Sequence, residues 1–231
     1  MCNTVEKDAP IKHLEFCLIA KLYETGSISI KSRNTSYQEY LMNLANMASN
    51  QSSCSRHKVG ALLSAMDKTI ISTGFNGTDS GVNHCSDIAN ALESAGFDDT
   101  WRISGGHREW SNTNENHAEF NMFRFANALF DIPDENIKNA DYAVNKQFEK
   151  YQQNVFNIFN HNSIDITEYF SSVYVTHMPC LKCTDLIIKY SKTYNITKVY
   201  FNKIWYNDIN DISAAAKRFN LAGIDLIHLM Q

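Results

Sequence analysis

Two short motifs that lie far apart in the chain carry residue types able to bind a metal ion and to move protons. The first is His117-Ala118-Glu119, and the second is Pro179-Cys180-Leu181-Lys182-Cys183. One imidazole and two thiolates are three of the four ligands of a tetrahedral zinc ion, and an open fourth position suits the water molecule of a catalytic site. The sequence therefore predicts a catalytic zinc bound by His117, Cys180 and Cys183. Glu119 is placed to act as general acid and base beside that water.

The spacing of these residues restricts where they can lie on helices. Cys180 and Cys183 are three apart, so on one helical turn their sulfur atoms share a face. Pro179 suits the start of a helix, and the amino end of a helix lowers the pKa of a thiol. His117 and Glu119 would point in opposite directions on a regular helix, about 200° apart around its axis. We therefore expect the metal to lie over the ends of two helices that meet at one edge of a sheet.

Neither motif is specific alone, because C-x-x-C also occurs in zinc ribbons and redox pairs and H-x-E is common. In this order, H-x-E followed by P-C-x-x-C is the signature of zinc-dependent nucleobase deaminases. The predicted chemistry is attack of hydroxide, generated at zinc, on the amine-bearing carbon of an aminopyrimidine or aminopurine. Glu119 would take the water proton, protonate the ring nitrogen and assist the departure of ammonia.

Composition and charge limit the class of partner. The 231 residues suit one domain with elaborations. The formal net charge of −4 provides no basic field for a polynucleotide, so we expect a small-molecule substrate and no nucleic-acid partner. The amino-terminal residues show no secretory pattern, and their longest apolar run, residues 16–20, is too short to cross a membrane. With a C-x-x-C pair among six cysteines, metal binding in the cytoplasm is favoured over disulfides.

Hydrophobic periodicity predicts helices alternating with strands. Helices are expected near residues 36–47, 117–130, 180–190 and 212–219, and strands near 60–64, 70–75, 173–176, 198–201 and 224–229. Residues 76–106 are expected to be mostly loop, with a helix near 89–95. This alternation predicts an α/β fold with three layers, α/β/α. The main domain is expected over residues 36–231, with an extension at 1–35 and a polar, helical insertion at 131–166.

Several further stretches resemble one known family, the cytidine and deoxycytidylate deaminases, and most closely its phage-type deoxycytidylate deaminases. The stretches are Tyr37–Met42, Cys54–Ala61 (C-x-x-x-K-V-G-A), Ser72–Gly77 (S-T-G-F-N-G), His107–Ser111 (H-R-E-W-S) and Asn114–Glu119 (N-E-N-H-A-E). The resemblance runs from about Ser36 to Leu229 and leaves out the insertion. It implies a cytidine deaminase-like sandwich with a five-stranded mixed sheet. The implied activity is hydrolysis of dCMP to dUMP and ammonia, which supplies dUMP for thymidylate synthesis.

The resemblance also implies substrate contacts. Asn76 would hydrogen-bond the sugar hydroxyl, although Asn76-Gly77 is also a common turn pair. The backbone around Ala118 would bind the pyrimidine edge. Arg56 and Lys58 are candidate phosphate contacts, and solvated surface charges are the alternative.

A second, structural zinc is implied by the same resemblance. Its ligands map onto Cys54, Cys85, His107 and Glu115, and two cysteines, a histidine and a carboxylate can complete a tetrahedron. His84, next to Cys85, could take the place of Glu115. The alternative without a metal is a pair of buried thiols and a surface histidine.

The family further implies a homohexamer that is activated by dCTP and inhibited by dTTP, with Mg²⁺ accompanying the allosteric nucleotide. Other readings of the same motifs remain. A relative that deaminates adenosine in tRNA, or guanine, shares H-A-E and P-C-x-x-C. A nucleoside cytidine deaminase commonly has cysteine where His117 stands. A non-catalytic zinc-binding module would have no need of Glu119, and a 5-substituted cytosine nucleotide is a further candidate substrate.

Overall fold

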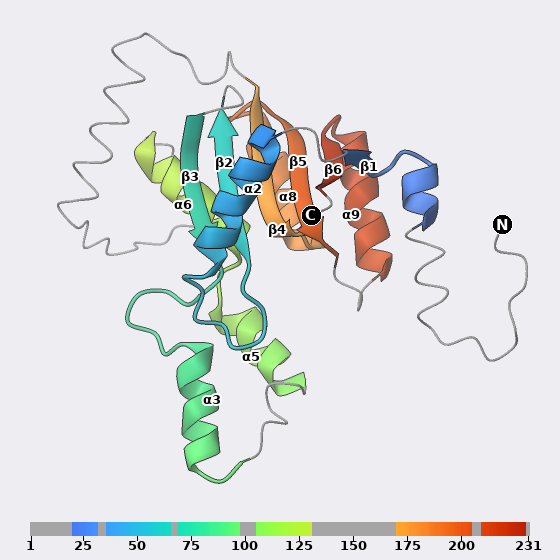
Figure 1. The fold of residues 1–231 in the computed structure, drawn as a ribbon. Coiled ribbons are helices and arrows are strands. Elements are labelled where there is room, and N and C mark those ends of the chain that lie inside the picture. The colour runs from blue at the N-terminus through green and yellow to red at the C-terminus, as the bar shows by residue number, and fades with distance from the viewer. Residues whose placement is uncertain are drawn as a thin grey trace, which may run out of the picture.

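The computed structural model describes residues 20–31, 36–65, 69–97, 105–130, 170–204 and 209–229. The predicted insertion at 131–166 and most of the extension at 1–35 lie outside these ranges. The centre of the molecule is a six-stranded sheet in the order β1-β6-β5-β4-β2-β3 (Figure 1). Its strands are β1 (Ser29–Lys31), β2 (Gly60–Ala65), β3 (Thr69–Phe75), β4 (Ser171–His177), β5 (Ile196–Lys203) and β6 (Asp225–Leu229).

The sheet is mixed, as the family resemblance implies. Strands β4, β5, β6 and β1 run parallel to one another, whereas β2 is antiparallel to both β4 and β3. Strands β2 to β6 are the five that the sequence predicts. The sixth, β1, belongs to the amino-terminal extension and adds three residues beside β6.

The described part of the amino-terminal extension packs against the rest of the fold. Leu22 and Ile28 are buried in the same hydrophobic core as the strands. The Tyr23 hydroxyl lies 2.6 Å from Nδ1 of His228 on β6. Residues 20–31 therefore complete one edge of the sheet.

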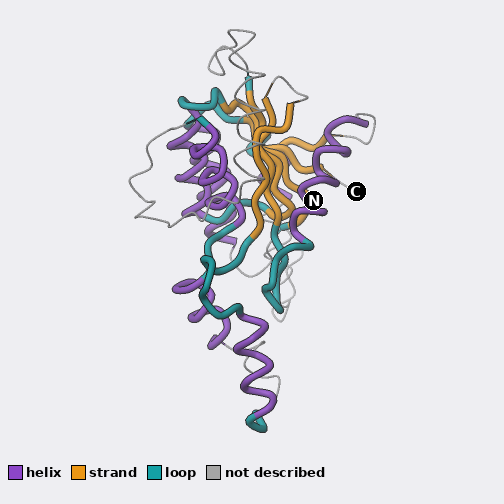
Figure 2. Tube along the Cα trace, turned by 90° about the vertical axis from the view of Figure 1, so that its left-hand side faces the viewer, coloured by secondary structure: helices purple, strands orange, loops and turns teal. Residues whose placement is uncertain are grey.

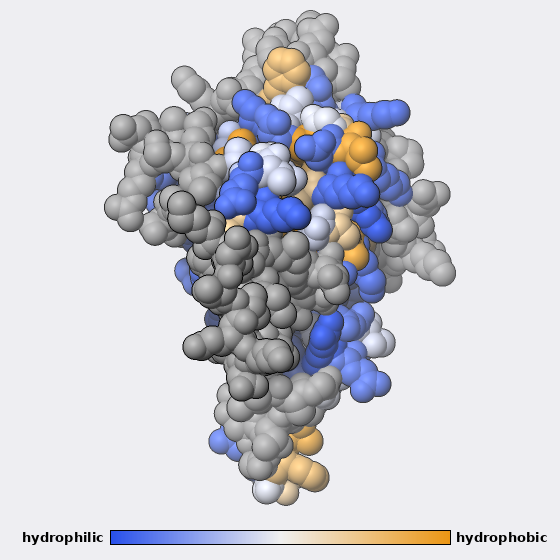
Figure 3. Space-filling view, turned by 90° about the vertical axis from the view of Figure 1, so that its right-hand side faces the viewer, coloured by the Kyte–Doolittle hydropathy of each residue, from blue (hydrophilic) through white to orange (hydrophobic). Residues whose placement is uncertain are grey.

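Helices cover both faces of the sheet, which confirms the predicted three layers (Figure 2). Helices α6 (Ala118–Leu129), α8 (Leu181–Ser191) and α9 (Ile209–Leu221) lie on one face, and α2 (Ser36–Ser49) lies on the other. On the side of the molecule where α9 lies, the described surface is mostly hydrophilic, with hydrophobic side chains scattered over it (Figure 3). No helix in the described ranges is long and apolar enough to cross a membrane.

Two glycines let helices approach the sheet closely. A Cβ on Gly74 of β3 would lie 2.3 Å from the carbonyl oxygen of Ala118, and one on Gly60 of β2 would lie 1.9 Å from that of Ala45. Any side chain at Gly74 would therefore displace the first turn of α6, which carries the H-A-E motif.

A buried polar network sets the position of α6 against the end of α8. Asn127 of α6 donates from Nδ2 to the Tyr190 hydroxyl at 2.9 Å, and its Oδ1 accepts from the Tyr194 hydroxyl at 2.7 Å. All three side chains are buried. Because an unpaired buried polar group is costly, these bonds fix the two helices in one relative position.

Helix α3 (Cys85–Ser94) lies within the region that the sequence predicts to be mostly loop, residues 76–106, and α5 (Gly105–Asn114) begins at its end. Helix α3 begins four residues before the expected start, and α5 was not expected. Both lie beyond the end of the sheet, and α3 extends away from it (Figures 1 and 2). Helix α5 escapes prediction because its sequence, GGHREWSNTN, is polar and lacks apolar residues at helical spacing.

Candidate active site and metal centres

The structure brings the predicted zinc ligands together at the amino ends of two helices. His117 is the residue that precedes α6, and Cys180 is the residue that precedes α8. Nδ1 of His117 lies 3.3 Å from Sγ of Cys183 and 3.6 Å from Sγ of Cys180. The three candidate ligand atoms all lie within 4.8 Å of one another, which is close enough to hold one ion.

The backbone explains how His117 and Glu119 reach the same place. His117 has extended dihedral angles, φ −71° and ψ 156°, and is therefore outside the helix proper. Glu119 lies in the first turn of α6 and is buried, with 3% of its surface exposed. The expected geometry over two helix ends is therefore the observed one.

Hydrogen bonds within this cluster favour metal binding. The bond between the two sulfur atoms lowers the pKa of Cys180 to about 4, with help from His117, and it raises the pKa of Cys183 above the ordinary thiol value. The bond to Cys180 raises the pKa of His117 to about 9. These groups share protons that a metal ion would replace, so the donor set fits a zinc ion.

The carboxyl group of Glu119 is suited to moving protons. Burial raises its pKa, and the nearby His117 partly opposes this effect. A carboxyl group with a raised pKa can both accept and return a proton near neutral pH, as a general acid and base must.

A second cluster forms where the resemblance implies one. Nε2 of His107 lies 3.3 Å from Sγ of Cys85 and 3.5 Å from Sγ of Cys54, and all three residues are buried. The bond between the two sulfur atoms lowers the pKa of Cys85 to about 4 and raises the pKa of Cys54. The backbone N–H of Ser55 also donates to Sγ of Cys85 at 3.0 Å.

The Glu115 carboxyl group interacts electrostatically with Cys85 and His107 of this second cluster, whose mutually close ligand atoms are those of Cys54, Cys85 and His107. Oε2 of Glu115 accepts a bond from the Ser111 hydroxyl at 2.6 Å, whereas its buried Oε1 has no hydrogen-bond partner. Burial raises the pKa of this carboxyl group, and Cys85 and His107 lie close enough to influence it. An unpaired buried oxygen beside three donors fits a fourth ligand. His84 is exposed, and its Nδ1 lies 2.9 Å from the Thr78 hydroxyl.

Both clusters line the same cavity, whose volume is about 290 Å³. Its lining residues include Cys54, His107 and Glu115 of the second cluster and His117, Glu119 and Cys180 of the first. This volume is near the lower end of the range for small-molecule sites. The candidate metal ligands therefore face a space that can hold a small molecule.

Comparison with known proteins identifies the family. The family model described as the cytidine and deoxycytidylate deaminase zinc-binding region matches residues 35–202. The chain belongs to this family. Zinc is thus the metal that its histidine and cysteine clusters are expected to bind.

Named relatives come from phages. The chain is 32% identical to the deoxycytidylate deaminase of Enterobacteria phage T4 over 109 residues, which are 37% of this chain and 56% of the relative. It is 33% identical to that of phage T2 over 110 residues, 37% of this chain and 57% of the relative. The chain thus spans little more than half the length of these curated relatives.

One similar solved structure is the dCMP deaminase of cyanophage S-TIM5 in complex with dCMP and dUMP. The identity is 20% and the TM-score is 0.48, over 86% of this chain and 100% of that chain.

The family's expected substrate contacts lie at the cavity with one exception. Arg56, Asn76 and Ala118 line it, whereas the exposed Lys58 is not among the described lining residues. The Asn76 side chain also forms hydrogen bonds with the backbone. Its Oδ1 accepts from Val59 N–H at 2.8 Å, and its Nδ2 donates to the carbonyl oxygen of His57 at 2.9 Å.

The cavity is also lined by four charged or titratable residues that sequence reasoning did not assign. They are His57, Arg108, His177 and Asp211. Arg108 follows His107 directly, so the second cluster brings it to the cavity wall. Burial lowers the pKa of His57 and lowers that of His177 to about 4, with Lys203 adding to the effect at His177. His57 and His177 are therefore neutral near pH 7, which leaves Arg56 and Arg108 as the permanent positive charges of the cavity wall.

Proposed function

We propose that this protein is a zinc-dependent deaminase that hydrolyses dCMP to dUMP and ammonia, and so supplies dUMP for thymidylate synthesis. The observation that carries the proposal is the meeting of His117, Cys180 and Cys183 beside the buried carboxyl group of Glu119. The resemblance to phage deoxycytidylate deaminases supports the choice of base and of nucleotide.

Each residue of the first cluster has a separate task in this proposal. His117, Cys180 and Cys183 would hold zinc, which when bound makes water a nucleophile near neutral pH. Glu119 would accept a proton from the attacking water and deliver it to the ring nitrogen of cytosine. Glu119 would then take the remaining proton from the hydroxyl group added to the ring carbon and pass it to the amino group, so that the carbonyl forms and ammonia leaves.

The second cluster would hold a structural zinc through Cys54, Cys85, His107 and Glu115. The unpaired Oε1 of Glu115 supports this ligand set over one that contains His84. With four protein ligands, the ion would have no open position, as is usual for structural zinc.

Arg56 and Arg108 would bind the 5′-phosphate of the substrate. Both line the cavity, and arginine suits phosphate because its planar fork of donors pairs with two oxygen atoms at once. The backbone at Ala118 would contact the pyrimidine edge, and Asn76 would contact the sugar while it braces Val59 and His57.

The proposal extends to assembly, regulation and location. We expect a homohexamer in the cytoplasm, or in the host cytoplasm if the protein is phage-encoded. We expect activation by dCTP and inhibition by dTTP, with Mg²⁺ accompanying the regulatory nucleotide. Light scattering in the presence and absence of dCTP and Mg²⁺ tests the assembly, and initial rates test the regulation.

One assay tests the activity. The purified protein is offered dCMP, dCTP, deoxycytidine, guanine and a tRNA anticodon hairpin, and release of ammonia is measured. Turnover of dCMP is expected, with at least tenfold lower efficiency on deoxycytidine because it has no phosphate. Turnover of guanine or the hairpin alone would assign a different base. Inactivity on every compound in a zinc-loaded sample would favour a non-catalytic zinc-binding module.

A further inference from the structure

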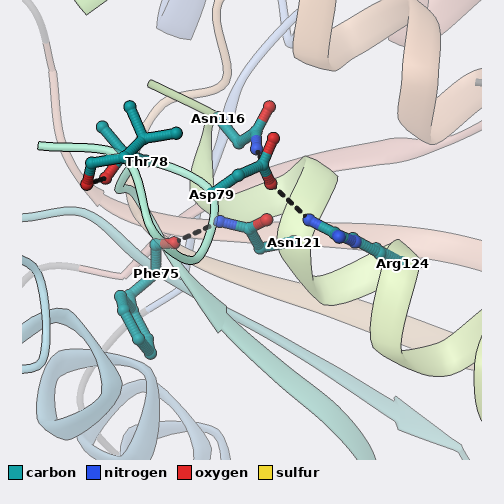
Figure 4. Close-up of polar contacts among 7 residues, drawn as sticks. Phe75, Thr78, Asp79, Asn116, Asn121 and Arg124 are labelled. Atoms are coloured by element: carbon teal, nitrogen blue, oxygen red, sulfur yellow. Dashed lines mark hydrogen bonds and ion pairs between the residues drawn. The ribbon is translucent and has the colours of Figure 1, made fainter. Parts of the chain in front are cut away.

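Side-chain hydrogen bonds connect the loop that follows β3 to the amino end of α6 (Figure 4). Asn121 donates from Nδ2 to the carbonyl oxygen of Phe75 at 2.8 Å. Oδ1 of Asp79 accepts from Nδ2 of Asn116 at 3.0 Å and from Nη1 of Arg124 at 2.6 Å. A single carboxylate oxygen thus joins the residue before His117 to the middle of α6.

Asn116 is the residue through which Asp79 can reach the candidate active site. Its backbone N–H donates to the carbonyl oxygen of Gly77 at 2.8 Å, and its own carbonyl oxygen accepts from Gly77 N–H at 3.1 Å. Asn116 lies between Glu115 of the second cluster and His117 of the first. Its backbone and side chain are therefore both held by the loop, and any shift of Asn116 moves a candidate ligand on each side.

The other end of the same loop reaches the second cluster. The Thr78 hydroxyl donates to the carbonyl oxygen of Val82 at 3.2 Å and lies 2.9 Å from Nδ1 of His84. His84 precedes Cys85 and begins α3. The loop is thus bonded to a neighbour of each cluster.

We propose that Asp79 is a positioning residue, which acts through Asn116 to set the place of His117. The inference rests on the proposed function for the role of His117. Asp79, Asn121 and Arg124 are not among the described residues that line the cavity, so Asp79 acts without touching substrate.

The expected effect on catalysis exceeds the effect on stability. The Asp79 side chain is 57% exposed and the Arg124 side chain is 18% exposed, so the carboxylate of this pair is at the surface and its contribution to folding is modest. A displacement of about 1 Å at a catalytic centre can, however, slow a reaction by up to ~100-fold. If Asp79 served stability alone, its substitution would lower Tm and leave the kinetics of the folded enzyme unchanged.

The test compares Asp79→Ala with wild type, using dCMP turnover and the rate at which zinc is released to a chelator. We expect kcat to fall about tenfold with KM within about twofold, and one of the two zinc ions to leave several-fold faster. Asp79→Asn should recover most of the loss, because an amide oxygen still accepts from Asn116 and Arg124. Arg124→Ala should produce a smaller loss, and the double variant Asp79→Ala/Arg124→Ala should resemble Asp79→Ala alone.

Asp185→Ala is the matched control. Asp185 forms an ion pair with Arg218 that joins α8 to α9, and its side chain is 58% exposed, close to the value for Asp79. This variant removes a pair whose carboxylate is equally exposed, although Arg218 is 43% exposed and Arg124 is 18% exposed. It should keep kcat and zinc release within about twofold of wild type.

The possible outcomes separate the two proposals. A lower Tm for Asp79→Ala, with kcat and zinc release unchanged, would overturn the positioning role, as would an equal loss in Asp185→Ala. If Asp79→Ala does not fold, Asp79→Asn and Arg124→Ala test the positioning role instead. Unchanged kinetics and unchanged zinc release in both variants would reject it. If wild type fails to turn over dCMP, the proposed function fails, whereas the zinc-release rates still test whether Asp79 holds His117.

Discussion

The two metal-binding clusters line one cavity but rest on different scaffolds. The first is built on helices that pack against the sheet, and α6 alone buries seven of its twelve residues. The second cluster takes its residues from a loop, from α3 and from the region of α5. The buried residues of α3 are Cys85 and Ala89. The hydrophobic core can therefore assemble the first cluster without help, whereas little apolar packing holds the second together.

This difference suggests different uses for similar ligands. A centre that is positioned by the core can leave one coordination position open for chemistry, because the metal is not needed to hold the chain together. A centre that lies beyond the end of the sheet has little packing around it. A metal ion with four protein ligands would therefore add most to its stability. Each prediction below tests this division between catalysis and stability.

The largest effect is expected from Glu119→Gln in the first cluster. Because glutamine cannot accept and return protons, kcat for dCMP should fall by about 10³-fold. The zinc content should stay at two ions per chain, and Tm should not fall, because glutamine keeps the size of the buried side chain and removes a charge that burial disfavours. Steady-state kinetics and metal analysis of one sample check both parts. Retained turnover would remove Glu119 from the chemistry.

Cys85→Ser should act mainly on stability. Loss of the second zinc should reduce the free energy of unfolding by about 2–3 kcal/mol, which lowers Tm by roughly 5–10 °C for a chain of this size. Calorimetry with metal analysis measures the change, and dCMP turnover of the remaining folded protein should persist. Cys180→Ser is the comparison, since it should abolish turnover with a smaller change in Tm.

The fourth ligand of the second cluster gives a sharper version of the same test. Glu115→Gln should release the second zinc and lower Tm, whereas His84→Ala should keep both zinc ions. The reverse pattern would show that His84 completes the site and would contradict the reading of the unpaired Oε1 of Glu115.

Arg108→Ala should change substrate affinity by an intermediate amount. A charge-assisted hydrogen bond to phosphate is worth about 1.5–3 kcal/mol, so KM for dCMP should rise at least tenfold. KM for deoxycytidine, which carries no phosphate, should stay within about twofold and serves as the internal control. Equal effects on both substrates would indicate that Arg108 shapes the cavity and does not bind the phosphate.

Sequence reasoning recovered the first cluster more completely than the second. The spacing in P-C-x-x-C and H-A-E, with the helix starts beside them, was enough to predict that His117, Cys180 and Cys183 meet over two helix ends. The second cluster came only from family resemblance, because Cys54, Cys85 and His107 are separated by polar segments that show no periodicity. The sequence leaves the choice between Glu115 and His84 open, because His84 is next to Cys85 and Glu115 follows His107 by eight residues. The proposal of Glu115 rests on its unpaired Oε1.

The elements that escaped prediction are short or polar. Strand β1 has three residues and gains its place from pairing with β6, which no local pattern indicates. Arg108, His57 and His177 come from three separate elements and meet only because the sheet and α5 bring them to one cavity. Long-range packing of this kind is not encoded in the spacing of any single segment.

The smallest effect is expected in the pH dependence of stability, where the two regions can again be compared. In the folded protein burial lowers the pKa of His177 from 6.5 to about 4, so the unfolded state binds more protons between these values. Stability should therefore fall as the pH is lowered through this range, by about 1–2 kcal/mol after allowance for the partial exposure of the ring. His177→Asn should flatten a plot of Tm against pH between 6.5 and 4. His57→Asn, beside the second cluster, should flatten it less, because the pKa of His57 is lowered without reaching so low a value. A wild-type Tm that is constant over this range would show that His177 takes up its proton in the folded protein as readily as in the unfolded chain.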